Sequence, residues 1–130
     1  MDAAALAREK HVSLTTFKRD GTPVSTPVWV VSDDGRRLLV WSAADTWKVK
    51  RIGRDPHVRV AGCDFHGTVH TEVLEGTARL LPSSDGPLVD RLLRRKYPTK
   101  RPLDALNTML RVIRRRPKGA SAYIEVVLRD

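Results

Sequence analysis

Basic residues are concentrated in one short segment that could bind an anion. Between Thr46 and Pro56 the chain carries Lys48, Lys50, Arg51 and Arg54. Asp45 or Thr46 can cap a helix there by accepting a hydrogen bond from a free N–H group, and Pro56 limits it to one or two turns. A helix start carries partial positive charge, so nearby cations favour a phosphate site. The alternative is a solvated basic helix face.

Other familiar chemistries find little support in the residues. The chain has no G-x-x-x-x-G-K-[ST] loop, no G-x-G-x-x-G fingerprint and no G-x-S-x-G elbow. Three histidines could be combined with Cys63 or Glu72 as metal ligands: His57, His66 and His70. Their spacing matches no closed zinc pattern, so we expect no metal site. No pair or triad of side chains predicts a catalytic centre.

The composition indicates one domain, residues 1–130, with an anionic partner. The net charge is +9 and 41% of residues are hydrophobic. Such a charge attracts nucleic acid, an anionic membrane or a small anionic ligand. The single cysteine, Cys63, excludes an internal disulfide framework and favours a buried structural thiol. With no apolar run of membrane-spanning length and no signal peptide, we expect a soluble cytoplasmic protein.

Alternating apolar residues predict strands around this segment. After a short helix over residues 2–9, we expect strands over residues 12–17, 22–32, 36–41, 57–63 and 68–81. Asp20-Gly21 predicts a hairpin between the first two. Pro23 and Pro27 cannot donate to a sheet, so the second strand should be an edge or carry a bulge. Gly76 suggests a bulge or a bend in the fifth strand.

Two helices and a last strand complete the predicted order. Amphipathic patterns predict helices over residues 87–97 and 103–116, followed by a strand over residues 120–128. Four arginines could bind the phosphates of nucleic acid or form a solvated face: Arg111, Arg114, Arg115 and Arg116. Aromatic residues are only 5% of the chain and do not alternate with them, so no stacking platform is indicated. Five strands, a helical insert and a returning strand are typical of a small antiparallel barrel.

Several short motifs occur in an order that matches a known family. They are Leu14-Thr15-Thr16-Phe17, Asp20-Gly21-Thr22-Pro23, Thr26-Pro27-Val28-Trp29, Val40-Trp41-Ser42, Lys48-Val49-Lys50-Arg51-Ile52, Arg54-Asp55-Pro56-His57-Val58 and Glu75-Gly76-Thr77-Ala78. The chain resembles the pyridoxamine 5'-phosphate oxidase-like split β-barrel proteins over roughly residues 8–128. More narrowly, it looks like the F420-dependent oxidoreductases of actinobacteria, the FDOR-B type.

This resemblance implies a mainly β fold, a six-stranded antiparallel split β-barrel with short flanking helices. It also implies a homodimer with the cofactor in a groove between subunits. By position, the phosphate contacts would be Thr46, Lys48, Arg51 and, as a further candidate, Lys50. The residues along the cofactor ring would be Pro27, Val28, Trp29, Trp41 and Ser42. Trp47 and Gly53 depart from some relatives, and the bulky Trp47 could cover the ring or narrow the substrate pocket.

The resemblance implies an F420H2-dependent oxidoreductase that moves a hydride to an unsaturated small organic acceptor. The cofactor carries the chemistry, which fits the absence of a side-chain catalyst from the motifs. A phosphodiester with an acidic tail also suits a basic helix start. Two alternatives stay open: an FMN-dependent oxidase or flavin reductase of the same fold, and a non-catalytic cofactor- or nucleic-acid-binding protein.

Overall fold

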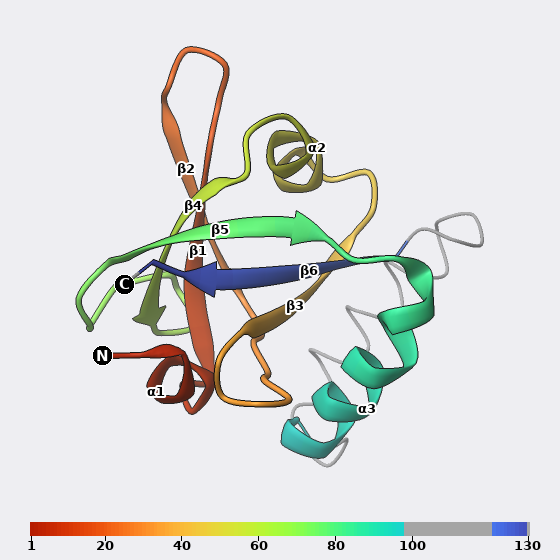
Figure 1. Ribbon diagram of the computed structural model, residues 1–130. Helices are drawn as coiled ribbons and strands as arrows, with labels where there is room; N and C mark the ends of the chain where they lie inside the picture. Colours follow the sequence, from red (N-terminus) through yellow and green to blue (C-terminus); the bar gives the residue numbers. More distant parts are fainter. Residues whose placement is uncertain (98–120, 130) are drawn as a thin grey trace.

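The computed structural model describes residues 1–97 and 121–129. These residues contain the strands β1 (His11–Phe17), β2 (Pro23–Val28), β3 (Leu38–Ala43), β4 (His57–Cys63), β5 (Leu74–Leu80) and β6 (Ser121–Leu128) (Figure 1). They also contain the helices α1 (Ala3–Ala7), α2 (Trp47–Arg54) and α3 (Gly86–Lys96), with a 3₁₀ turn, η1 (Ser83–Asp85). No helix among the described residues is long and apolar enough to cross a membrane.

The strands form one curled antiparallel sheet in the order β2-β1-β4-β5-β6-β3. Just after β2, Val31 pairs with Leu39 of β3, with N–H···O distances of 3.0 and 2.7 Å. This bridge joins the two ends of the sheet order, so the sheet curls into a barrel that is open along most of β2 and β3. The predicted six-stranded antiparallel split barrel is therefore confirmed.

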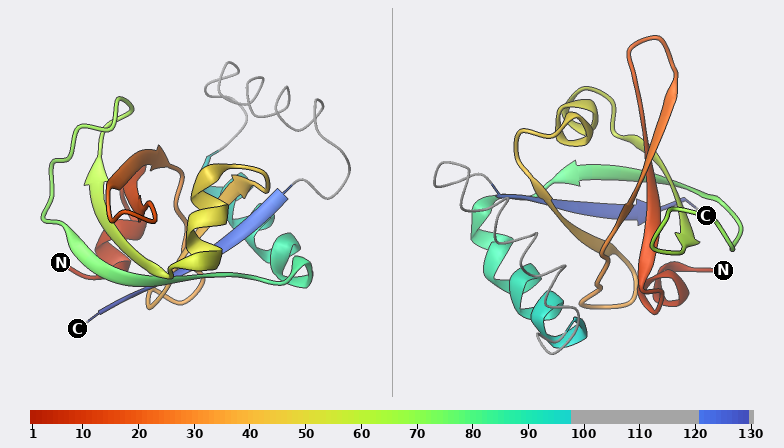
Figure 2. Two further views of the ribbon diagram at one scale, coloured as in Figure 1. Left: turned by 90° about the horizontal axis from the view of Figure 1, so that it is seen from above. Right: turned by 180° about the vertical axis from the view of Figure 1, so that it is seen from behind.

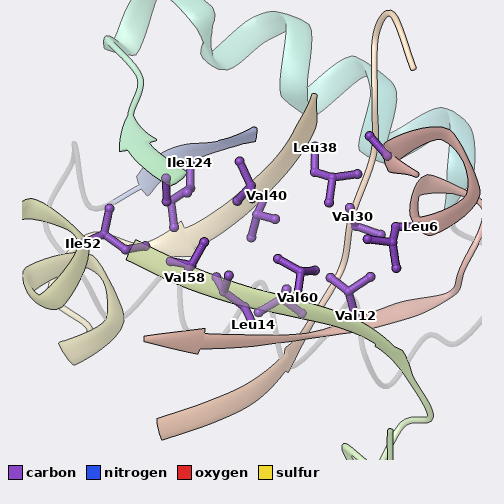
Figure 3. Close-up of a cluster of buried hydrophobic side chains, with 14 of the residues drawn as sticks. Leu6, Val12, Leu14, Val30, Leu38, Val40, Ile52, Val58, Val60 and Ile124 are labelled. Carbon is purple, nitrogen blue, oxygen red and sulfur yellow. The ribbon is translucent and has the colours of Figure 1, made fainter. Parts of the chain in front are cut away.

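Two hydrophobic clusters lie on opposite faces of β3. Inside the barrel, side chains from all six strands and from α1 and α2 converge, among them Leu6, Leu14, Val40, Ile52 and Ile124 (Figure 3). Outside it, an outer cluster lies beneath α3; its members are Val31, Leu39, Leu81, Val89 and Leu93, with Trp29, Trp41, Leu92, Tyr97 and Tyr123 packed against them. Because strand residues alternate between faces, neighbours such as Val40 and Trp41 serve different clusters.

The helices close the open parts of the barrel. The two views of Figure 2 and Figure 1 place α2 and the tip of the β1–β2 hairpin at one end, α1 at the other, and α3 along the side. Asp2 caps α1, since its Oδ1 accepts a hydrogen bond from Ala5 N at 2.9 Å. The edge position predicted for the second strand is also confirmed, because β2 pairs only with β1 along its length.

Three predicted strands differ from the structure by two residues or more at one end or both. The expected strand over residues 68–81 begins only at Leu74, because Thr71 Oγ1 accepts a hydrogen bond from the Gly62 amide at 2.8 Å and takes the place of a strand partner. The second strand ends at Val28, and the third begins at Leu38, after a turn held by Asp34. The helix predicted over residues 103–116 lies outside the described residues.

Candidate functional site

The side chain of Thr46, one of the two predicted caps, does not cap the start of α2. Thr46 occupies the N-cap position, but its side chain makes no cap hydrogen bond. Its Oγ1 instead donates to Ala43 O at 2.9 Å and lies 3.1 Å from Ser42 Oγ at the end of β3. The expectation that a side-chain oxygen of Thr46 would satisfy a first-turn N–H group is thus wrong. The first turn of a helix has N–H groups without intrahelical acceptors, so this end of α2 can receive an anion.

Lys48 lies in this first turn with its charge uncompensated. Its side chain is half-buried, and burial lowers the pKa of its ammonium. Among residues 1–97 and 121–129, it has no hydrogen-bond or ion-pair partner within bonding distance. A desolvated cation without a partner is costly, and a bound anion would relieve that cost. Thr46, Ser42 and Lys48 therefore form one end of the candidate site.

A cationic pocket of about 560 Å³ lies along the outer face of the same helix. Its lining residues are Lys18, Arg19, Trp47, Lys50, Arg51 and Arg54. The four helical members recur at the spacing that puts residues on one side of a helix, while Val49 and Ile52 are buried on the other. The structure thus brings Lys50 and Arg51 together in one pocket and leaves Lys48 outside its lining.

Sequence reasoning missed the contribution of the β1–β2 hairpin. Lys18 and Arg19 come from its tip and complete the pocket opposite α2. Arg54 connects α2 to the β1–β2 hairpin, because its Nη2 donates to Phe17 O at the base of the hairpin. The available signal was the pair of cations directly before Asp20-Gly21, but nothing in the sequence indicated that this turn would meet α2.

Trp47 is exposed at the pocket, where its role was left open. Its relative exposure is 68%, the ammonium of Lys50 lies 4.6 Å from its ring centroid, and its side chain lines the pocket. An exposed indole beside several cations offers a flat apolar surface within an anion-attracting field.

The residues predicted to lie along a cofactor ring divide between three environments. Trp29 and Trp41 pack against the outer cluster, and Trp29 stacks on Tyr97 with centroids 4.3 Å apart and planes 6° apart. Val28 is buried in the barrel core. Pro27 is exposed on the edge strand β2. We call Trp29 and Trp41 the aromatic wall. Trp41 is followed in the chain by Ser42, at the end of β3, and then by the turn that enters α2.

Two histidines of the described residues pair with carboxylates, and Cys63 is buried. His57 Nε2 contacts Glu75 Oε2, and His70 Nε2 lies 3.0 Å from Glu9 Oε2. Cys63 is buried, and burial raises the pKa of its thiol. Within the part of the chain that the structure describes, no three His, Cys, Asp or Glu side chains are grouped to hold a metal ion.

Comparisons with known proteins give the family and the fold. Among solved structures, a conserved hypothetical protein of Mycobacterium tuberculosis is similar with a TM-score of 0.69 and 21% identity, over 100% of this chain and 82% of that one. An F420 reductase has a TM-score of 0.63 and 20% identity over 99% and 94% of the two chains. A FAD-binding protein from Mesorhizobium loti has a TM-score of 0.62 and 17% identity over 96% and 85%. Likeness at these identities shows the fold alone.

No curated protein matches the sequence. The family profile of pyridoxamine 5'-phosphate oxidase, however, matches residues 2–122, from the start of the chain into β6. That range includes the whole of α2, the hairpin and both tryptophans of the aromatic wall. The split barrel and a match across nearly all of its length lead to one conclusion: the chain belongs to the pyridoxamine 5'-phosphate oxidase family.

Proposed function

We propose that the protein is an F420H2-dependent oxidoreductase of the FDOR-B type that reduces an unsaturated small organic acceptor. The observation that carries this proposal is the distribution of cations around α2. Lys48 at the helix start has no partner among residues 1–97 and 121–129, and five of the six residues that line the adjacent pocket are basic. Similarity in fold to an F420 reductase is consistent with it.

The number of cations favours F420 over FMN. FMN has a single phosphate, for which the start of α2 with Lys48 is sufficient. F420 has a phosphodiester followed by glutamate carboxylates, so it needs a second cationic surface beyond the phosphate site. The cationic pocket lies along a different face of α2 from Lys48 and supplies that surface. FMN remains the second candidate, and the likeness to a FAD-binding protein supports a flavin of the ordinary kind.

The proposed roles follow the two ends of the site. Thr46 and Lys48 hold the phosphate, with Ser42 orienting Thr46, while Lys50 and Arg51 hold the tail together with Lys18 and Arg19. Trp29 and Trp41 border the ring, and the deazaflavin supplies the hydride when it is bound. The residues of the chain bind, orient and exclude water, which is how a protein supports cofactor chemistry. We also propose a homodimer, in which the partner subunit completes the groove.

Titration of the purified protein with each cofactor tests this function. Quenching of the deazaflavin fluorescence with micromolar affinity, and no comparable binding of FMN, is the expected result. Tight FMN binding without F420 binding would replace the proposal by the FMN alternative. Binding of duplex DNA that persists at physiological salt, with neither cofactor bound, would favour the nucleic-acid-binding alternative.

A further inference from the structure

Lys96, near the end of α3, is held by three backbone carbonyls from two distant parts of the chain. Its Nζ donates to Ala7 O at 2.6 Å, Glu9 O at 2.7 Å and Val30 O at 2.6 Å. Burial lowers the pKa of Lys96 to about 8, so at neutral pH the side chain keeps three N–H donors for these three acceptors. The ammonium thus ties the end of α1 to the chain that follows β2.

The next residue, Tyr97, makes a second connection between the same two segments. Its hydroxyl donates to Lys10 O at 2.7 Å and accepts from Val30 N at 3.2 Å. Its ring stacks on Trp29, the neighbour of Val30. Both backbone groups of Val30 are therefore bound by side chains of α3 and its C-cap, while the Val30 side chain points into the barrel core (Figure 3).

These contacts occupy the place where strand pairing would otherwise continue. The β1–β2 register runs from Phe17↔Pro23 to Val12↔Val28, and its extension would pair Lys10 with Val30. The Tyr97 hydroxyl instead lies between the Lys10 carbonyl and the Val30 amide. One residue later, Val31 pairs with Leu39 of β3. The chain leaves β1 and joins β3 at the point where Lys96 and Tyr97 are inserted.

We propose that Lys96 and Tyr97 are positioning residues that form a wedge at the split of the barrel and thereby fix Trp29 in the aromatic wall. Without the wedge, the Val30 amide can reach the Lys10 carbonyl directly, the ladder extends by two residue pairs (His11 with Trp29 and Lys10 with Val30), and Trp29 loses its stacking partner or its orientation. The claim about the strand position stands on the contacts alone, while the effect on ligand binding rests on the proposed function.

Two matched pairs of variants separate the wedge from the general effect of losing a hydroxyl or a charge. Tyr97→Phe removes the bridging hydroxyl and keeps the ring that stacks on Trp29. Tyr123→Phe removes a hydroxyl that donates to Asp90 Oδ2 at 3.1 Å, with no bond to the segment after β2. For the ammonium, Lys96→Met is compared with Arg95→Met, since Arg95 is exposed and adjacent in sequence.

The experiment measures local structure and binding in the full-length protein. In proton–nitrogen NMR spectra, Tyr97→Phe and Lys96→Met should shift the Val30 amide and the Trp29 indole signals, and the two control variants should not. We expect cofactor affinity to fall about 5- to 20-fold in the wedge variants, while affinity for inorganic phosphate, which needs only the start of α2, changes less than about twofold.

The outcomes distinguish the wedge from the proposed function. Unmoved Val30 and Trp29 signals in both wedge variants would overturn the wedge. Shifted signals with unchanged cofactor affinity would overturn its role in positioning the wall. If the unmodified protein binds neither F420 nor FMN, the proposed function fails, and the NMR signals alone decide whether the wedge sets the strand position.

Discussion

Replacement of Lys48 by Gln should weaken cofactor binding and yet stabilise the protein without ligand. The side chain is half-buried, burial lowers its pKa, and the described residues give it no partner. A charge-assisted hydrogen bond from its ammonium to a phosphate contributes about 1.5–3 kcal/mol. Its loss corresponds to about a 10- to 150-fold higher Kd. In the absence of ligand, the variant no longer buries an uncompensated charge, so its melting temperature should rise.

Lys10→Gln is the control for the general loss of positive charge, since Lys10 has an exposed side chain at the other end of the barrel. The assay is titration of each variant with F420 by fluorescence quenching, together with thermal unfolding of the ligand-free proteins. Lys10→Gln should raise Kd by no more than about twofold, because dissolved salt screens the interaction between a distant exposed charge and the bound cofactor. Equal affinities in the two variants would refute the phosphate role of Lys48. A lower melting temperature for Lys48→Gln would show that the lysine is structural instead.

The sign of the pH dependence follows from the same residue. The folded-state pKa of Lys48 is lower than its ordinary value of 10.5, so the unfolded chain holds this proton to higher pH. Without ligand, the contribution of Lys48 to the free energy of unfolding should therefore increase as pH rises from its folded-state pKa to its unfolded-state pKa. Phosphate binding favours the charged form, so cofactor affinity should decrease over the same range. This decrease should be absent from Lys48→Gln.

Three further predictions concern other residues of the fold and the site. Arg51→Gln should raise the Kd for F420 about 10-fold or more and flatten its salt dependence, with little effect on FMN; equal losses for both cofactors would contradict a tail-binding pocket. Trp47→Ala should weaken F420 binding more than Trp47→Phe does, and identical affinities would exclude a stacking role for the indole. Glu125 accepts hydrogen bonds from Arg79 Nε at 2.7 Å and Arg37 Nη1 at 2.8 Å, so Glu125→Gln should lower the free energy of unfolding by about 2 kcal/mol at pH 7. Because the bond from Arg79 lowers the pKa of Glu125, this stabilisation is present above pH 4.5 and is lost as pH falls through the folded-state pKa; urea unfolding that shows a pH-independent difference would contradict it.

Local patterns in the sequence were sufficient for most of the barrel. Alternation of apolar residues predicted β4 with its observed bounds, and the hairpin at Asp20-Gly21 has Gly21 at φ 88°, the backbone conformation that glycine supplies readily. The same alternation failed over residues 68–73. There the side chain of Thr71 accepts from the Gly62 amide at 2.8 Å, so a side chain takes the place of a strand partner. The alternation of apolar and polar residues in the sequence does not reveal such competition by side chains.

The site was only half predictable for a similar reason. The concentration of cations identified α2, and helical spacing could have separated Lys48 from Lys50 and Arg51. The hairpin residues Lys18 and Arg19 reach the pocket only because the barrel curls, which is a property of the whole sheet. The capping role assigned to Thr46 failed because Ala43 O and Ser42 Oγ, both set by the end of β3, compete for its hydroxyl.

The place of β6 in the sheet has a consequence for how this chain folds on the ribosome. β6 lies between β5 and β3, where Trp41 faces Tyr123 across more than half of the sequence. Until Ser121–Leu128 emerges, the Val31–Leu39 bridge is the one strand pairing open to β3 among the described residues, whereas β1, β2, β4 and β5 can already pair with one another. Contacts of such sequence separation form late and slowly. The nascent chain therefore exposes the edges of β3 and β5 until β6 has emerged, and this is the interval in which a chaperone would matter most.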